Sequence, residues 1–163
     1  MYDSHLKIAD SKSGKGVFTS IQIPANVPIA EALGPIFTDK NLPNPNDPSI
    51  LQIGPNVYMT ASGGMLPEFI NHNCDPNCAF YVVGNRAILF SLYVIRAGTE
   101  LTFDYSTTST DTLDTWQMKC TCGSSKCRKV ISGYQYLDAS LQNSYKKKGA
   151  IPLFITFPVF QKV

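Results

Sequence analysis

Glycine and proline recur along the whole chain, and this feature limits the fold more than any other. Eleven glycines and eleven prolines occur among 163 residues. Both residue types interrupt helices and end strands. Long helices are therefore excluded over most of the chain, and short strands joined by turns are expected. The length suits one ordinary domain with its own core.

Apolar, β-branched runs lie between these breaks and predict strands. Gly84-Asn85 separates two of the runs by two residues, which is typical of a tight hairpin. The prolines of NLPNPNDP, at 41–48, permit neither a helix nor a central strand, so this segment is expected to be a loop. The expected strands are 17–23, 51–59 with a break at Gly54-Pro55, 79–83, 86–94 and 100–105.

One short helix is expected near the C-terminal end. Asp138 is a suitable N-cap, Leu141 and Tyr145 fall on one face, and Gly149 would end the helix. Lys146–Lys148 would either meet the negative end of the helix dipole or form a solvated helix end.

The segment after this helix is apolar. Residues 151–160 read IPLFITFPVF and contain two prolines. They would either pack onto the domain as a tail or contact a partner, including a second copy of the chain.

Charge and hydropathy exclude several classes of protein. The net charge of +2 gives no general attraction to nucleic acid or to anionic lipid, so direct binding to either is not expected. Hydrophobic residues make up 44%, which excludes disorder over the whole chain. No apolar run reaches the roughly 18–20 residues that span a bilayer, and residues 1–12 lack the apolar core of a signal peptide. A soluble, intracellular protein of the cytoplasm or nucleus is expected, and secretion as an effector stays open.

Five cysteines form two groups. Cys120, Cys122 and Cys127 follow the pattern C-x-C-x4-C, while Cys74 and Cys78 lie earlier. Their odd number argues against a disulfide framework. Three thiolates from one short loop need one more donor to close a tetrahedral zinc site, and either earlier cysteine can supply it. The alternative is a set of free or redox-active thiols.

Three further segments combine polar groups with aromatic residues. SGKGVF, at 13–18, places two glycines just before an expected strand, although such a pair is usually a turn. FINHNCDPNC, at 69–78, can hold a polar ligand or form a turn with a buried histidine. TELTFDY, at 99–105, ends in a tyrosine that a strand would place in a cleft or in the core.

Together and in this order, the segments resemble the SET-domain protein lysine methyltransferases. INHNCDPNC is similar to the family's N-H-S-C-x-P-N, GTELTFDY to its G-E-E-L-T-x-D-Y, and CTCGSSKC to its post-SET cysteine motif. The small stand-alone SET proteins of microbes look most similar. The resemblance covers residues 12–136.

A fold and a domain division come with this resemblance. The implied fold is mainly β, with several small sheets and a C-terminal segment threaded beneath a loop as a pseudoknot. The short helix expected near the C-terminal end follows this fold. The implied division is a SET domain at 5–117, a post-SET zinc-binding segment at 118–136, and a helix with an apolar tail at 137–163.

The resemblance also implies the residues of the site. Tyr105 would stand at the point of methyl transfer, and Phe103 would set how many methyl groups are added. Residues that would contact S-adenosylmethionine are Lys15, Gly16, Val17, Asn71, His72 and Tyr105. One structural zinc ion would bind Cys74, Cys120, Cys122 and Cys127, leaving Cys78 spare.

The implied activity is transfer of methyl groups from S-adenosylmethionine to a lysine side chain of a protein or peptide. Histones are one candidate substrate, and a di- or trimethyl product is expected because Phe103 leaves room near the amine. The chain departs from common family residues at Ala32, Pro35, Glu68 and Asn73. Two alternatives are a zinc-stabilised binding module that has lost catalysis and an oligomerisation domain that uses the apolar tail. The latter explains none of the motifs.

Overall fold

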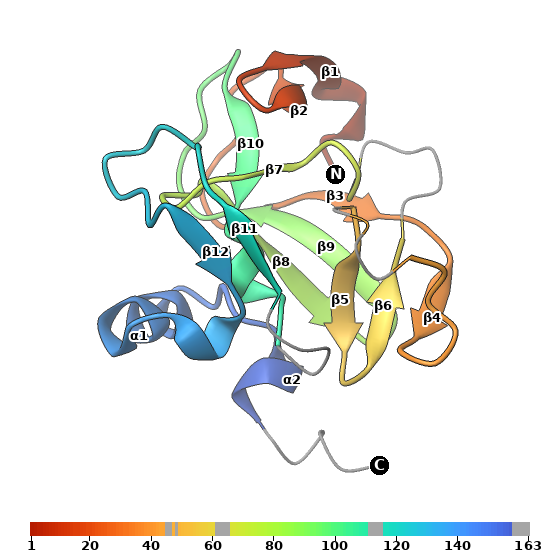
Figure 1. The fold of residues 1–163 in the computed structure, drawn as a ribbon. Helices are drawn as coiled ribbons and strands as arrows, with labels where there is room; N and C mark the ends of the chain where they lie inside the picture. The colour runs from red at the N-terminus through yellow and green to blue at the C-terminus, as the bar shows by residue number, and fades with distance from the viewer. Residues whose placement is uncertain (45–46, 48, 61–65, 111–115, 158–163) are drawn as a thin grey trace.

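The computed structural model describes residues 1–44, 47, 49–60, 66–110 and 116–157. Over these residues the chain forms four small β-sheets with a few short helices (Figure 1). The prediction of a mainly β fold is confirmed. No helix in the described ranges is long and apolar enough to cross a membrane.

One sheet gathers the three motif segments. Its strand order is β1-β2-β10-β7, with β10 antiparallel to β2 and parallel to β7. Residues that are far apart in sequence therefore become neighbours across two strand boundaries. The strands are β1 (Leu6–Ser11), β2 (Gly14–Thr19), β7 (Asn71–His72) and β10 (Glu100–Phe103).

The sequence-based bounds of β2 are wrong. The strand starts at Gly14 because it pairs with β1 from the Ser11–Gly14 turn onward, so both glycines lie inside the strand. It ends at Thr19, and Ile23 makes only an isolated bridge to Ile95.

The predicted strand at 100–105 is also too long. Asp104 ends β10 and caps a 3-10 helix, Tyr105–Thr107, by accepting a hydrogen bond from the backbone N–H of Ser106 at 3.1 Å. Tyr105 is therefore the first residue of a helical turn, which turns its side chain off the sheet.

A second sheet forms much of the core. β8 and β9 are joined at Gly84-Asn85, where Gly84 has a φ of 55°, and this confirms the predicted hairpin. Phe80 and Leu89 are fully buried there. The strand β9 stops at Ser91, before the predicted end at residue 94, because its partner β8 begins opposite Ser91, at Cys78. The strands are β3 (Pro28–Ala32), β8 (Cys78–Val83) and β9 (Arg86–Ser91).

Two smaller sheets complete the β structure. The predicted break at Gly54-Pro55 is confirmed, since the chain turns there, with Asn56 at a φ of 55°, between two antiparallel strands. Of the predicted loop at 41–48, residues 45, 46 and 48 lie outside the described residues. The strands are β4 (Ile36–Thr38), β5 (Leu51–Gly54), β6 (Val57–Met59), β11 (Gln117–Lys119) and β12 (Val130–Ser132).

The predicted C-terminal helix is confirmed. The helix α1 (Ala139–Lys147) is capped by Asp138, whose Oδ1 accepts from the Leu141 N–H at 2.9 Å. Gly149 follows it with a φ of 64°. Tyr145 is buried on the face that meets the domain.

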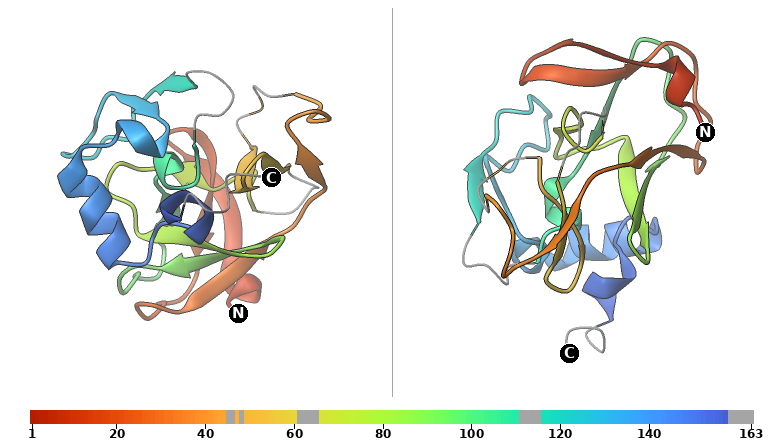
Figure 2. Two further views of the ribbon diagram at one scale, coloured as in Figure 1. Left: turned by 90° about the horizontal axis from the view of Figure 1, so that it is seen from below. Right: turned by 90° about the vertical axis from the view of Figure 1, so that its right-hand side faces the viewer.

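Part of the apolar tail packs onto the domain. The short helix α2 (Leu153–Thr156) buries Phe154 and Ile155. Figures 1 and 2 place both helices at the end of the molecule opposite the β1–β2 hairpin. Residues 158–160 of the predicted tail lie outside the described residues. The threaded segment, the three-part division of the chain and self-association through the tail stay predictions.

Candidate active site

Two cavities share Tyr105 in their walls, together with Asp47 and Ser49. The smaller, of about 110 Å³, is enclosed mainly by aromatic and aliphatic groups. The larger, of about 680 Å³, is lined mainly by polar and charged residues. Representative residues of the smaller are Gln52, Tyr58, Ile70, Phe103 and Trp116. Representative residues of the larger are Lys15, Asn71, His72, Met118 and Cys122.

Tyr105 is held in a fixed position in the walls of both cavities. Its hydroxyl donates a hydrogen bond to the carbonyl oxygen of Ile70 at 3.0 Å. Its ring packs against Phe103 at 4.8 Å between centroids and lies edge-on to His72 at 5.3 Å. Burial raises the pKa of Tyr105 to about 12. The hydroxyl is therefore neutral at physiological pH, and it can position a ligand but cannot serve as a base.

Phe103 belongs to the core and to the cavity wall at once. Its side chain is buried and meets Phe80 edge-to-face, with centroids 4.9 Å apart. It also lines the smaller cavity. The ring therefore has little freedom to move, and the cavity wall at this point is apolar.

Asn71 connects β7 to the strands beside it. Its Nδ2 donates to the carbonyl oxygen of Lys15 at 2.8 Å and to Oε1 of Glu100 at 2.7 Å. Lys15, Asn71, His72 and Tyr105 all line the larger cavity. Gly16 and Val17 do not line it, since Val17 is fully buried in the core and Gly16 lies beside Glu100. Contact of their backbone with the cofactor stays a prediction.

His72 lies between Tyr105 and the cysteines. Its Nδ1 accepts from the backbone N–H of Tyr105 at 3.2 Å, and its Nε2 lies 3.2 Å from Sγ of Cys74. Burial is the main cause that lowers its pKa to about 4. The ring is therefore neutral, and its 3.5 Å approach to Asp104 is not an ion pair. With Nδ1 accepting, the single ring proton is assigned to Nε2, facing the sulfur.

Four cysteines gather beside His72. The Sγ atoms of Cys74 and Cys120 are 3.7 Å apart, and Cys122 and Cys127 pack against this pair. Donor atoms of His72, Cys74, Cys120 and Cys122 all lie within 4.8 Å of one another. Cys78 is buried elsewhere, in the main core.

The cysteine cluster has the chemistry of a metal site. Burial raises the pKa of Cys74, and it raises that of Cys120 to about 12. Burial acts the same way on Cys122, but hydrogen bonds from backbone N–H groups outweigh it and lower its pKa to about 7. Buried thiols become thiolates together only when a cation compensates their charge, so the donor set fits a zinc ion.

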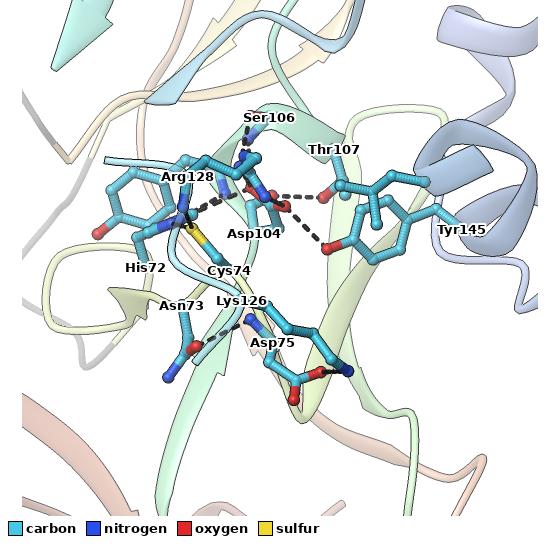
Figure 3. A network of polar contacts seen from close by, with 12 residues as sticks. His72, Asn73, Cys74, Asp75, Asp104, Ser106, Thr107, Lys126, Arg128 and Tyr145 are labelled. Atoms are coloured by element: carbon cyan, nitrogen blue, oxygen red, sulfur yellow. Dashed lines mark hydrogen bonds and ion pairs between the residues drawn. The ribbon is translucent and has the colours of Figure 1, made fainter. Parts of the chain in front are cut away.

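A buried ionic network lies behind the site, and the sequence analysis missed it (Figure 3). Asp104 is fully buried and accepts two hydrogen bonds from the Arg128 guanidinium, at 2.6 and 2.7 Å, and one from the Tyr145 hydroxyl at 2.8 Å. The backbone N–H of Arg128 also points at Sγ of Cys74, at 3.4 Å. Both residues are adjacent in sequence to predicted site residues, since Asp104 precedes Tyr105 and Arg128 follows Cys127. This adjacency is the signal that could have pointed to them.

The residues that depart from common family positions lie in different places. Glu68 lines the larger cavity. Ala32 is buried in β3 and lines neither cavity. Asn73 stabilises a turn by accepting from the Asp75 N–H at 2.9 Å (Figure 3).

Comparisons with known proteins show the family of the chain. Residues 14–106 match the SET domain family model. The chain is 32% identical over 132 residues to the histone-lysine N-methyltransferase trithorax of Drosophila virilis, and 39% identical over 84 residues to the histone-lysine N-methyltransferase ASHH2 of Arabidopsis thaliana. These matches cover 73% and 49% of this chain. The chain belongs to the SET-domain family.

Solved structures share the fold. A crystal structure of KRYPTONITE in complex with mCHG DNA and SAH superimposes with a TM-score of 0.64 at 30% identity, over 77% of this chain. A second KRYPTONITE structure, with mCHH DNA, an H3(1-15) peptide and SAH, has a TM-score of 0.63 at 28% identity. The expected SET fold is confirmed. The matches span 3% of trithorax, 5% of ASHH2 and 28% of the first KRYPTONITE chain.

Proposed function

We propose that this chain is a protein lysine methyltransferase that uses S-adenosylmethionine. The observation that carries the proposal is that Tyr105 lies in the walls of both a wide cavity with several polar and charged lining residues and a smaller, mainly apolar cavity. The wide cavity suits a nucleoside with a charged amino-acid part, and the smaller one suits the methylene chain of a lysine. Family membership and neighbours that bind SAH support the same assignment.

The chemistry requires a neutral lysine amine. The reference pKa of lysine is about 10.4, so deprotonation at pH 7 costs roughly 4–5 kcal/mol. When bound, S-adenosylmethionine supplies an electrophilic methyl group on a positively charged sulfur. An apolar channel lowers the pKa of a lysine within it by desolvation. The walls formed by Phe103 and Ile70 supply such an environment.

Tyr105 would orient the amine rather than deprotonate it. Its hydroxyl proton is directed to the Ile70 carbonyl oxygen, so an oxygen lone pair is free to accept from an amine N–H. The proton of the lysine would leave through water. Correct orientation of two reacting groups can account for much of a rate enhancement.

We assign the zinc ligands to Cys74, Cys120, Cys122 and Cys127. The donor atoms within 4.8 Å of one another belong to His72, Cys74, Cys120 and Cys122, and Cys127 is not in this group. We nevertheless prefer Cys127 to His72 as the fourth ligand, because Nδ1 of His72 accepts a backbone N–H, which leaves Nε2 protonated. A protonated Nε2 donates to the Cys74 sulfur instead of binding a metal. The ion would hold residues 120–128 against the larger cavity.

The substrate is proposed to be a lysine-containing peptide, with histone H3 as the first candidate. One KRYPTONITE structure contains an H3(1-15) peptide, and curated relatives are histone-lysine methyltransferases. Both KRYPTONITE structures also contain DNA. The expectation that this chain does not bind nucleic acid directly therefore stays a prediction, as does its cellular location.

Two measurements test the proposed function. Calorimetry would measure binding of S-adenosylhomocysteine (SAH), and incubation with methyl-labelled S-adenosylmethionine would measure transfer to H3 peptides and to mixed cellular proteins. Binding with transfer to lysine is the expected result. Binding without transfer to any substrate would favour the catalytically inactive binding module. Absence of both would overturn the proposal.

A further inference from the structure

The orientation of the Asn71 side-chain amide is fixed by its partners. Its Nδ2 donates to the Lys15 carbonyl oxygen at 2.8 Å and to Oε1 of Glu100 at 2.7 Å. Both partners can only accept, so they must face the NH₂ group. Among the hydrogen bonds of the described residues, none uses Oδ1 of Asn71. Asn71 therefore meets the larger cavity with an acceptor to spare and no free donor.

Glu100 is itself held from two sides. Its Oε2 accepts from the Ser11 hydroxyl at 2.9 Å, while its Oε1 accepts from Asn71. Its backbone oxygen accepts from Nδ2 of Asn77 at 2.7 Å, which fixes β10 at this residue. The carboxylate does not line either cavity, so it acts from behind Asn71.

Gly16 makes room for this carboxylate. A Cβ atom at Gly16 would lie 2.2 Å from Oε1 of Glu100 and 3.1 Å from Nδ2 of Asn71. Gly16 is not among the glycines with positive φ, so its backbone does not require glycine. Glycine is required at position 16 for a steric reason, because a larger residue would collide with the Glu100–Asn71 pair and not with a ligand.

We propose that Glu100 is a positioning residue that turns the oxygen of the Asn71 amide toward the larger cavity and so makes the site select an ammonium group. This deepens the proposed function and depends on it, because the amino-acid part of the cofactor carries one α-ammonium and one α-carboxylate. An amide with its NH₂ group toward the cavity would instead favour the α-carboxylate of the cofactor. The negative charge of Glu100 behind the amide also favours an ammonium group in the cavity.

The test compares two probes by calorimetry. One is SAH, and the other is its deaminated analogue, which keeps the carboxylate and lacks the α-amino group. The unaltered protein should bind SAH roughly tenfold more tightly, because an unpaired Asn71 oxygen is penalised. In Glu100→Ala, the Lys15 carbonyl oxygen alone still holds the NH₂ group, so the amide is held less firmly. SAH affinity should then fall roughly tenfold while the affinity for the analogue stays the same. A merely structural role would weaken both probes equally.

A double-mutant cycle provides a second route. Gly16→Ala should displace the carboxylate and abolish the preference for SAH, as Glu100→Ala does. Adding Gly16→Ala to Glu100→Ala should then cause little further loss, because the two closest atoms that its Cβ would strike, both of Glu100, are gone and only Nδ2 of Asn71 at 3.1 Å remains. The matched control is Glu31→Ala, which removes a half-buried carboxylate that is paired with the exposed Arg86 and lines neither cavity, and which should leave both affinities unchanged.

The outcomes separate the inference from the proposed function. If the unaltered protein binds neither probe, the proposed function fails. If it binds SAH without preference over the analogue, or if both Glu100→Ala and Gly16→Ala keep the preference, only the role of Glu100 is overturned. Should Glu100→Ala fail to fold, Gly16→Ala alone gives the same comparison of probes.

Discussion

Arg128 binds Asp104 through two charge-assisted hydrogen bonds, of 2.6 and 2.7 Å, and the carboxylate is fully buried. Asp104 directly precedes Tyr105, and Arg128 directly follows Cys127. The pair therefore fastens the cysteine segment to a residue that lies in the walls of both cavities. Tyr145, which also donates to Asp104, brings α1 into the same network.

Removing one partner of this pair should be costly. Arg128→Met leaves the buried Asp104 charge without its cation, so the free energy of unfolding should fall by roughly 3–5 kcal/mol, as measured by urea unfolding. Arg128→Met/Asp104→Asn should be less destabilised, because the uncompensated charge is gone. The control is Arg86→Met: Arg86 also donates two hydrogen bonds to one carboxylate, that of Glu31, but does so at the surface, where such a pair contributes only about 0–1 kcal/mol. Equal losses at the two arginines would contradict this prediction.

The cysteine cluster should bind about one zinc ion per chain. Cys122→Ser should lower the metal content and loosen residues 120–128, because three remaining donors close the site poorly. Elemental analysis and the melting temperature measure both effects. Cys78→Ala is the matched control, since Cys78 lies in the main core and should leave the metal content unchanged. A fully active preparation without metal would refute a structural zinc.

Tyr105→Phe should lower kcat far more than it changes SAH affinity. Tyr105 lines both cavities and its hydroxyl orients the amine, so loss of the hydroxyl affects the reacting geometry and not the binding of the cofactor. Steady-state kinetics and calorimetry separate the two effects. Near-normal kcat would show that Tyr105 is only a packing residue.

Local signals predicted the elements that depend on local geometry. Gly84-Asn85 predicted the hairpin, and Asp138 with Gly149 predicted both ends of α1, because a turn or a cap is determined by adjacent residues. The bounds of β2 were wrong because pairing with β1, a partner that the sequence did not reveal, extends the strand to Gly14. Tyr105 left the expected strand because the Asp104 carboxylate competes with the sheet for the backbone.

The motifs predicted which residues gather, but not how they act on one another. Asn71 and Tyr105 line one cavity, and Cys122 and Cys127 pack against Cys74 and Cys120, while their roles as ligands stay predictions. Glu100 was missed as a positioning residue because its role depends on contacts with Ser11 and Asn71, which lie 89 and 29 positions away. Such contacts exist only once β1, β2, β10 and β7 form one sheet.

Phe103 should determine the number of methyl groups that the enzyme adds. Its ring forms an apolar wall of a cavity of about 110 Å³ and lies 4.8 Å from the Tyr105 ring. A phenylalanine offers no acceptor to a partly methylated amine, so that amine can turn into position for another transfer. We expect the unaltered protein to reach the di- or trimethyl state on a peptide substrate.

Phe103→Tyr should stop mainly at monomethyl lysine with a similar initial rate, because the added hydroxyl would bond the amine and crowd the space in which it rotates. Mass spectra of the peptide over time measure this, with Phe90→Tyr, a strand aromatic that lines neither cavity, as the control. A purely monomethyl product from the unaltered protein at long times would rule out this role for Phe103.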